Sequence, residues 1–370
     1  MMDAGRRFLG LSARWVTARV LRYDLMLLTI VTCLIAVGFI TLFSAGYSFP
    51  WRIEDQMRNI VVALAAMLGV SFIPIRWVRK VSFIAFAGGC LLLLATELFG
   101  VTVKGATRWL DVGVRIQPSE IMKLAVPMML AWYYWKRSEQ RAWWDHFLAF
   151  ALLAIPVGFI LKQPDLGTAI LVSIAGLAVI FFAGVSAKLV AACCALVVAM
   201  LPVLWTMLHD YQRERILTLI DPTLDPLGKG FHTLQALIAI GSGGFSGKGW
   251  MEGTQAHLDF IPERTSDFIF AVFGEEFGFV GGVLLLVLYL SLVARSFYIA
   301  ACAKSLYARL LAAAIGVIFF TYSFVNIGMV SGILPVVGVP LPFMSYGGTA
   351  LLILGICTGI LLSISVDARD

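Results

Sequence analysis

Charged side chains are scarce in this chain of 370 residues, and the motifs by which soluble enzymes bind nucleotides are missing. Only 14% of the residues are Asp, Glu, Lys or Arg, whereas 60% are hydrophobic, so a soluble domain of this size could not bury its apolar surface. The sequence contains no GxxxxGK[ST] loop and no GxGxxG after a strand pattern. The net charge of +6 comes from basic residues that form no single patch, which argues against nucleic-acid binding.

Cysteine and histidine are also few, and neither type has the spacing of a metal site. All six cysteines fall within apolar runs, which is typical of small buried side chains. The four histidines are scattered. The sequence therefore predicts no bound metal from Cys or His, and it leaves a metal held by carboxylates as unknown.

Repeated apolar runs of about 20 residues predict an all-α polytopic membrane protein. We expect about ten transmembrane helices in one integral membrane domain, 1–370, with boundaries uncertain by several residues. The predicted spans are 23–45, 58–75, 79–99, 119–136, 144–162, 167–184, 187–208, 267–294, 306–330 and 344–365.

Lys and Arg fall mainly in alternate connections between the predicted spans, which sets the orientation in the membrane. The N-terminal segment 1–22 carries five arginines and is predicted to be cytoplasmic. With ten spans both termini are then cytoplasmic, and the polar segment 209–266 is a large loop on the outer face between spans 7 and 8. Turn residues interrupt this loop, and a short amphipathic helix is predicted near 230–240.

Polar residues collect in three segments on the predicted outer face, where they could converge on one site. The segments are Lys104 to Arg115 with 117–123, then 162–165, then 209–267. Glu120 and Lys123 are three residues apart within a span, so they share a helix face, with Ser119 predicted as the N-cap. Such a pair is either self-satisfying or faces a wet cavity, and its depth in the span favours the cavity.

Asp267 is the acidic residue at the start of the eighth span, in the stretch DFIPERTSDFIFAVFGEEFG at 259–278. It could simply stabilise the first turn of the helix. Alternatively it is a general base, because partial burial raises the pKa of a carboxylate toward the range that suits proton abstraction. Glu275 and Glu276 cannot both lie on one helix face, so we expect at least one to brace a neighbouring helix.

The segment 331–348 is an uncharged loop that contains three prolines. An apolar loop in water would promote association. We therefore expect it to pack over the spans or to line a groove for a lipid tail.

Seven segments of the chain have unusual composition: KGATRWLDVG (104–113), QPSEIMKL (117–124), KQPDLGTA (162–169), 209–232, IAIGSGGFSGKGW (238–250), 259–278 and 326–348. Together they resemble the SEDS family (shape, elongation, division and sporulation). The similarity extends from about residue 24 onward, and the composition of the segments makes chance matching remote. The elongation branch resembles this chain most, and the division-specific relative FtsW is the alternative.

This resemblance implies a peptidoglycan glycosyltransferase that polymerises lipid II at the outer face of the bacterial inner membrane during cell elongation. The essential aspartate of the family falls on Asp267, and its acid–base pair falls on Glu120 and Lys123. The resemblance also implies a class B penicillin-binding protein as partner. One departure is Thr265-Ser266, where the family usually has His-Thr. The role of that imidazole is therefore in doubt, whereas the role of Asp267 is not directly affected.

Such a reaction needs a base for the acceptor hydroxyl, for which Asp267 is the candidate, and positive charge for the departing pyrophosphate. Basic residues on the correct side are candidates for binding the substrate: Lys123, Lys104, Arg108, Arg213 and Arg215. No soluble cofactor is required, but a divalent cation, Mg or Mn, could share the task. The competing function is a lipid II flippase, although a transporter favours polar groups and broken helices near the bilayer midplane.

Overall fold

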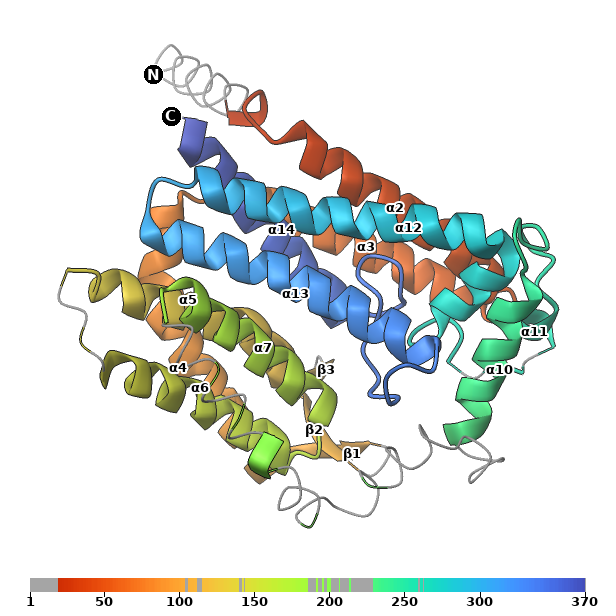
Figure 1. Ribbon diagram of the computed structural model, residues 1–370, viewed down its shortest axis with the longest axis horizontal. Helices are drawn as coiled ribbons and strands as arrows, with labels where there is room; N and C mark the ends of the chain where they lie inside the picture. The colour runs from red at the N-terminus through yellow and green to blue at the C-terminus, as the bar shows by residue number, and fades with distance from the viewer. Residues whose placement is uncertain are drawn as a thin grey trace, which may run out of the picture.

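The computed structural model describes residues 19–103, 106–111, 115–139, 142, 144–185, 191, 195, 198–200, 206, 213, 229–258, 260–261 and 263–369. Within these residues the chain forms a bundle of long helices that run side by side (Figure 1). The long helices are α2 (Leu25–Ala45), α3 (Pro50–Ser71), α4 (Ile75–Phe99), α5 (Pro118–Lys136), α6 (Trp144–Lys162), α7 (Leu166–Phe182), α12 (Ile269–Cys302), α13 (Leu306–Val330) and α14 (Gly348–Arg369).

The predicted fold class, an all-α polytopic membrane protein, is confirmed. Among the described residues, α2, α4, α6, α12, α13 and α14 are each long and apolar enough to cross a membrane. The shorter α7 and the more polar α3 and α5 match three further predicted spans. The predicted seventh span, 187–208, lies largely outside the described residues. Helix α10 (Lys229–Ser242) confirms the helix predicted near 230–240, and α11 (Thr254–His257) follows it.

Two predicted spans have the wrong limits. Helix α3 begins at Pro50 rather than at 58, because its charged first turns lower the hydropathy without stopping the helix. Pro50 fits this position, since the first helical residue needs no N–H partner. Helix α12 runs from Ile269 to Cys302 rather than over 267–294, and it is kinked at Gly278.

A small three-stranded sheet, absent from the predicted elements, joins α4 to α5. Its antiparallel strands are β1 (Val101–Val103), β2 (Ala106–Asp111) and β3 (Arg115–Ile116). In Figure 1 the sheet lies near the same end of the bundle as α10 and α11. This end also holds the first turn of α5, where the predicted site begins.

The two ends of the described chain meet at the opposite end of the bundle (Figure 1). Arg295 of α12 contacts the buried Asp24 carboxylate at 2.5 Å, and Arg369 lies 3.8 Å from the same group. Arg19 lies 3.7 Å from Asp367. These ion pairs tie α2, α12 and α14 together away from the predicted site.

Helices α13 and α14 form the centre of the bundle. In the apolar 18-residue stretch of each helix, 72% of α13 and 83% of α14 is buried, against 22% of α12. Helix α12 instead exposes large apolar side chains such as Leu284 and Val287, as expected for a surface that contacts lipid. Polar side chains on α13 are therefore enclosed by protein and must find partners there.

The kink in α12 is held by the loop at 243–249. Gly278 has φ 64° and ψ −161°, a conformation essentially restricted to glycine. The loop satisfies the backbone groups that the kink frees, with Phe279 N bonded to Gly244 O at 2.9 Å and Lys248 N bonded to Glu275 O at 3.1 Å. This arrangement fixes the direction of the first turns of α12, which follow Asp267.

Replacing Gly278 by Ala should destabilise the bundle. A Cβ at Gly278 would lie 2.2 Å from Gly247 N, in addition to the cost of the backbone conformation, which is about 1–3 kcal/mol. We expect a clearly lower melting temperature in detergent. The matched control is Gly282→Ala on the same helix, where a Cβ meets no atom within 4 Å, so its stability should be unchanged or slightly higher. Equal melting temperatures for both variants would contradict this role of the kink.

Candidate active site

Glu120 and Lys123 form a buried ion pair on one face of α5, as their spacing predicts. Lys123 Nζ lies 2.5 Å from Glu120 Oε1 and donates to the hydroxyl oxygen of Tyr322, on α13, at 2.6 Å. The Tyr322 hydroxyl lies 3.4 Å from the other Glu120 oxygen. The three side chains are 7%, 2% and 1% exposed for Glu120, Lys123 and Tyr322. The pair is therefore fixed by a phenol from another helix, which the sequence did not reveal.

The start of α5 differs from the prediction. Ser119 was expected to cap the helix, but Gln117 is the N-cap and Pro118 is the first helical residue. Proline suits this position because its fixed φ matches the first helical turn. The Ser119 hydroxyl is buried and has no hydrogen-bond partner among the described residues.

The first two predicted polar clusters converge. Asp165 caps α7 by accepting from Thr168 N at 3.2 Å, and it also accepts from the Gln117 amide at 3.1 Å. Arg108 of β2 lies 3.8 Å from the same carboxylate and donates to the carbonyl oxygens of Gln163 and Pro164. These contacts bind the small sheet to the turn between α6 and α7, beside the first turn of α5.

Asp267 lies in the turn at 263–268, immediately before α12, and its side chain is half-buried. Its carbonyl oxygen accepts from the Asn326 amide of α13 at 2.9 Å, and the same amide nitrogen donates to Val339 O at 2.7 Å. Gly338 passes beside the carboxylate, because a Cβ built there would be 3.3 Å from Asp267 Oδ2. With φ 73°, this position favours glycine, which permits the close approach.

One face of α13 connects the ion pair to the aspartate. Tyr322 and Asn326 are four residues apart, so they lie on the same face, about 6 Å apart along the axis. Tyr322 holds the Glu120–Lys123 pair, and Asn326 holds the backbone of Asp267. The three predicted catalytic residues thus lie at the same end of the bundle.

Further contacts fix the turn that carries Asp267. Arg52 of α3 donates to the buried Thr265 hydroxyl at 2.5 Å, and the Ser345 hydroxyl donates to Ser266 O at 2.6 Å. The buried Arg264 donates to Ala45 O at 2.7 Å. The contact between Arg52 and the Asp267 turn could not be predicted from the sequence, because Arg52 and Thr265 are 213 positions apart. A polar Asn326 within an apolar span was the signal that could have identified that residue.

An apolar groove of about 570 Å³ opens between α7, α13 and the loop at 331–347. Val337 O lies against α7, since a Cβ at Gly167 would be 2.8 Å from it. Of the two expectations for this loop, packing over the spans is confirmed. The loop also lines an apolar groove, and the occupation of that groove by a lipid tail stays a prediction. The groove lining includes Ile170, Ile174, Phe320, Phe324, Leu334 and Pro335.

Glu275 and Glu276 have structural partners, as predicted. Glu275 accepts from Lys248 Nζ at 2.6 Å and from Gln255 N at 3.0 Å, so it anchors the loop that holds the kink. Glu276 accepts from Ser44 of α2 and therefore braces a neighbouring helix.

Of the other basic residues predicted to bind substrate, the two that the structure describes, Arg108 and Arg213, contact residues other than Asp267. Lys104 and Arg215 lie outside the described residues. Arg213 donates to Thr206 O at 2.7 Å. The three guanidinium nitrogens of Arg108 contact the turn between α6 and α7. The assignment of these four residues to substrate binding stays a prediction.

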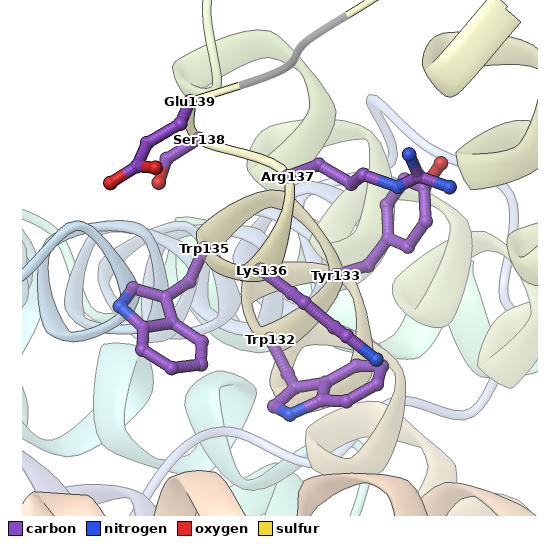
Figure 2. A pocket seen from close by; sticks show the side chains of 7 residues that line it. All are labelled: Trp132, Tyr133, Trp135, Lys136, Arg137, Ser138 and Glu139. Carbon is purple, nitrogen blue, oxygen red and sulfur yellow. The ribbon is translucent and has the colours of Figure 1, made fainter.

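A larger cavity, about 660 Å³, lies at the opposite end of α5 and is not part of this site. Figure 2 shows Lys136 extending along Trp132 and Arg137 reaching toward Tyr133. Lys136 Nζ is 5.0 Å from the Trp132 ring centroid. Indole rings paired with basic side chains are typical of a membrane–water interface.

Removing one partner of the buried pair should be more harmful than removing both. Lys123→Met leaves the Glu120 carboxylate in an apolar interior, which costs about 3–5 kcal/mol. We expect Glu120→Gln/Lys123→Met to recover much of the lost stability, because no uncompensated charge remains. Melting temperatures of the single and double variants in detergent test this. If the double variant is as unstable as the single variant, the stability lost in Lys123→Met does not come from an uncompensated Glu120 charge.

Comparison with known proteins agrees with the resemblance found in the sequence. The family described as cell cycle protein, which covers FtsW, RodA and SpoVE, matches residues 19–370. "Peptidoglycan glycosyltransferase MrdB" of Escherichia coli K12 is 46% identical over 352 residues, which is 94% of each chain. "Peptidoglycan glycosyltransferase RodA" of Treponema pallidum is 31% identical over 424 residues, covering 93% of this chain and 97% of that one.

Two solved structures share the fold. A chain from a structure described as the coordination of polymerization and crosslinking by a peptidoglycan synthase complex matches with TM-score 0.82 and 31% identity, covering 94% of this chain and 99% of that one. The rod shape determining protein RodA of Thermus thermophilus matches with TM-score 0.71 and 28% identity, covering 94% and 98%. This chain therefore belongs to the SEDS family.

Proposed function

We propose that this chain is a peptidoglycan glycosyltransferase that polymerises lipid II, with Asp267 as the general base. The observation that carries the proposal is the place of Asp267, which is half-buried and linked through α13 to the Glu120–Lys123 pair. The Asp267 carboxylate lies beside Gly338, which follows the groove residue Val337 in the chain. A lipid-linked sugar needs an apolar groove for its lipid tail next to a polar site for its pyrophosphate and sugar. The relatives named above carry the name of this activity.

In this reaction the acceptor sugar loses a proton from its 4-hydroxyl, and the oxygen attacks the anomeric carbon of the donor. The bond from that carbon to the lipid pyrophosphate breaks, and the pyrophosphate leaves with the bonding electrons. The Asp267 carboxylate takes the proton. Lys123 and Arg52 are two of the described cations near the site, and positive charge stabilises a leaving pyrophosphate.

The tail of the lipid substrate fits the apolar groove between α7 and α13. The groove is lined almost entirely by apolar side chains, and its wall at 334–337 leads to Gly338 beside Asp267. A tail lying there brings its pyrophosphate to the same end of the bundle as the carboxylate.

The proposed orientation places this end at the outer face of the inner membrane, with both termini in the cytoplasm. The described residues at the opposite end include Arg79, Lys80, Lys136 and Arg137, which fits the excess of Lys and Arg in cytoplasmic connections. The segments 1–22 and 209–266 are then cytoplasmic and periplasmic, respectively, within a single membrane domain.

A divalent cation, Mg or Mn, fits the site only if the substrate pyrophosphate supplies some of its ligands. Among the described residues no three His, Cys, Asp or Glu side chains cluster as a ligand set. Mg²⁺ is commonly held by one or two carboxylates together with substrate phosphates, and Asp267 offers one carboxylate. When bound, the cation would supply positive charge to the pyrophosphate.

The partner we propose is a class B penicillin-binding protein of the elongation complex. Glycan polymerisation alone leaves peptides uncrosslinked, and the similar chain of known structure belongs to a synthase complex of polymerization and crosslinking. The higher identity to MrdB, 46%, than to the probable glycosyltransferase FtsW of Geobacter metallireducens, 34%, favours elongation over division.

Asp267→Asn should abolish polymerisation while the protein remains folded. The amide cannot accept the proton, and loss of a general base typically costs about 10²–10⁴-fold in rate. Purified protein with its partner is supplied with lipid II in detergent, and glycan length is measured on a gel. The matched control is Glu263→Gln, which removes an exposed carboxylate from the same turn and should leave the rate unchanged.

Normal polymerisation by Asp267→Asn would contradict its role as base. Transfer of lipid II across vesicles by a wild-type protein that never links it would instead support the flippase. The Glu120→Gln/Lys123→Met variant tests the ion pair separately from Asp267. If the pair only stabilises the fold, the folded double variant polymerises lipid II at the wild-type rate.

Filling the groove should weaken binding of long lipid tails. Ile174→Trp places a large side chain in its lining, so the KM for lipid II with its natural tail should rise about tenfold, the equivalent of about 1.4 kcal/mol. A lipid-linked substrate with a short tail should be affected much less. An equal rise in KM for both substrates would show that the groove does not hold the tail.

A further inference from the structure

We propose that a second pocket, joined to the Asp267 turn by a backbone hydrogen bond from Tyr346, binds an N-acetylated sugar ring of the glycan. The proposal rests on the proposed glycosyltransferase function and assigns a subsite to it. The pocket has a volume of about 440 Å³. It is lined by Asp55, Arg58 and Asn59 of α3, Trp109 of β2, and Tyr346 and Thr349 around the start of α14.

A residue that lines the pocket is hydrogen-bonded to the Asp267 turn. Tyr346 N donates to Thr265 O at 2.8 Å, so a pocket residue is bonded to the turn two residues before Asp267. The Gln56 amide donates to Ser345 O at 3.1 Å and its oxygen accepts from Gly347 N at 3.3 Å, which fixes this segment to α3. The position of a ligand in the pocket is therefore fixed relative to the turn that carries the Asp267 carboxylate.

Several polar groups in the pocket have unused hydrogen-bonding capacity. Within the described part of the chain, the side chains of Asn59, Thr349 and Trp109 make no hydrogen bond. Gly348 has no side chain to cover the amide, since a Cβ there would lie 3.0 Å from Asn59 Oδ1. An amide, a hydroxyl and an indole N–H together suit a ligand that offers both donors and acceptors.

The chemistry of the pocket favours a neutral sugar over an anion or an acyl chain. Arg58 is paired with Asp55, so its charge is already balanced, and the Tyr346 hydroxyl lies 3.4 Å from the same carboxylate. The rings of Trp109 and Tyr346 provide apolar surface. A pyranose ring has C–H faces that pack on aromatic surface, and hydroxyl and acetamido groups at its edge that need polar partners.

Two substitutions on different elements test the pocket. Gly348→Ala narrows it beside Asn59, and Asn59→Leu removes the amide at similar size. We expect each variant, with its partner, to raise the KM for lipid II about five- to tenfold, to change kcat less than about twofold, and to shorten the glycan. The matched control is Gly347→Ala, whose Cβ would meet no atom within 4 Å and which should keep the wild-type KM.

Direct binding separates this inference from the function on which it rests. A soluble tetrasaccharide of N-acetylglucosamine, which is neutral, should bind Asp267→Asn protein as it binds wild type, and should bind Gly348→Ala and Asn59→Leu about five- to tenfold more weakly. Unchanged KM and tetrasaccharide affinity in both folded pocket variants overturn the subsite, whatever Asp267 does. Polymerisation by Asp267→Asn overturns the assigned base and leaves the binding result standing.

Discussion

The structure of the site depends on two hydrogen-bonding side chains on one face of α13. This helix is enclosed by protein, so Tyr322 and Asn326 must bond to other elements rather than to water. Tyr322 bonds to the ion pair of α5, and Asn326 bonds to the turn before α12 and to the loop after α13. Elements from three distant parts of the chain are thereby held in one arrangement.

The sequence predicted the parts of this site that obey local rules. Glu120 and Lys123 are paired because residues three apart share a helix face, and Asp267 precedes α12 because a charged residue marks the border of an apolar run. Tyr322 could not be found in this way, since its partners lie about two hundred positions away in sequence. The early start of α3 was missed for a related reason, because hydropathy detects lipid contact rather than helix.

The loop at 331–347 gives the site two sides with different chemistry. Its first half meets α7 and α13 along a surface with almost no polar atoms, and its second half, through Tyr346, meets α3 and β2 along a surface with free polar groups. The Asp267 carboxylate is next to Gly338, between the two halves. A substrate with a lipid tail and a sugar head matches these two surfaces, the tail on the apolar one and the sugar on the polar one.

Thr265, where the family usually has histidine, is a buried residue of the turn that carries Asp267. Thr265 is fully buried, its hydroxyl accepts from Arg52, and its carbonyl oxygen accepts from Tyr346 N. The Thr265 side chain orients Arg52, whose guanidinium carbon lies 5.8 Å from the centroid of the Tyr346 ring. This chain therefore holds Arg52 through a hydroxyl where the family usually has an imidazole. Asp267, two residues later, is held separately by its contacts with Asn326 and Gly338.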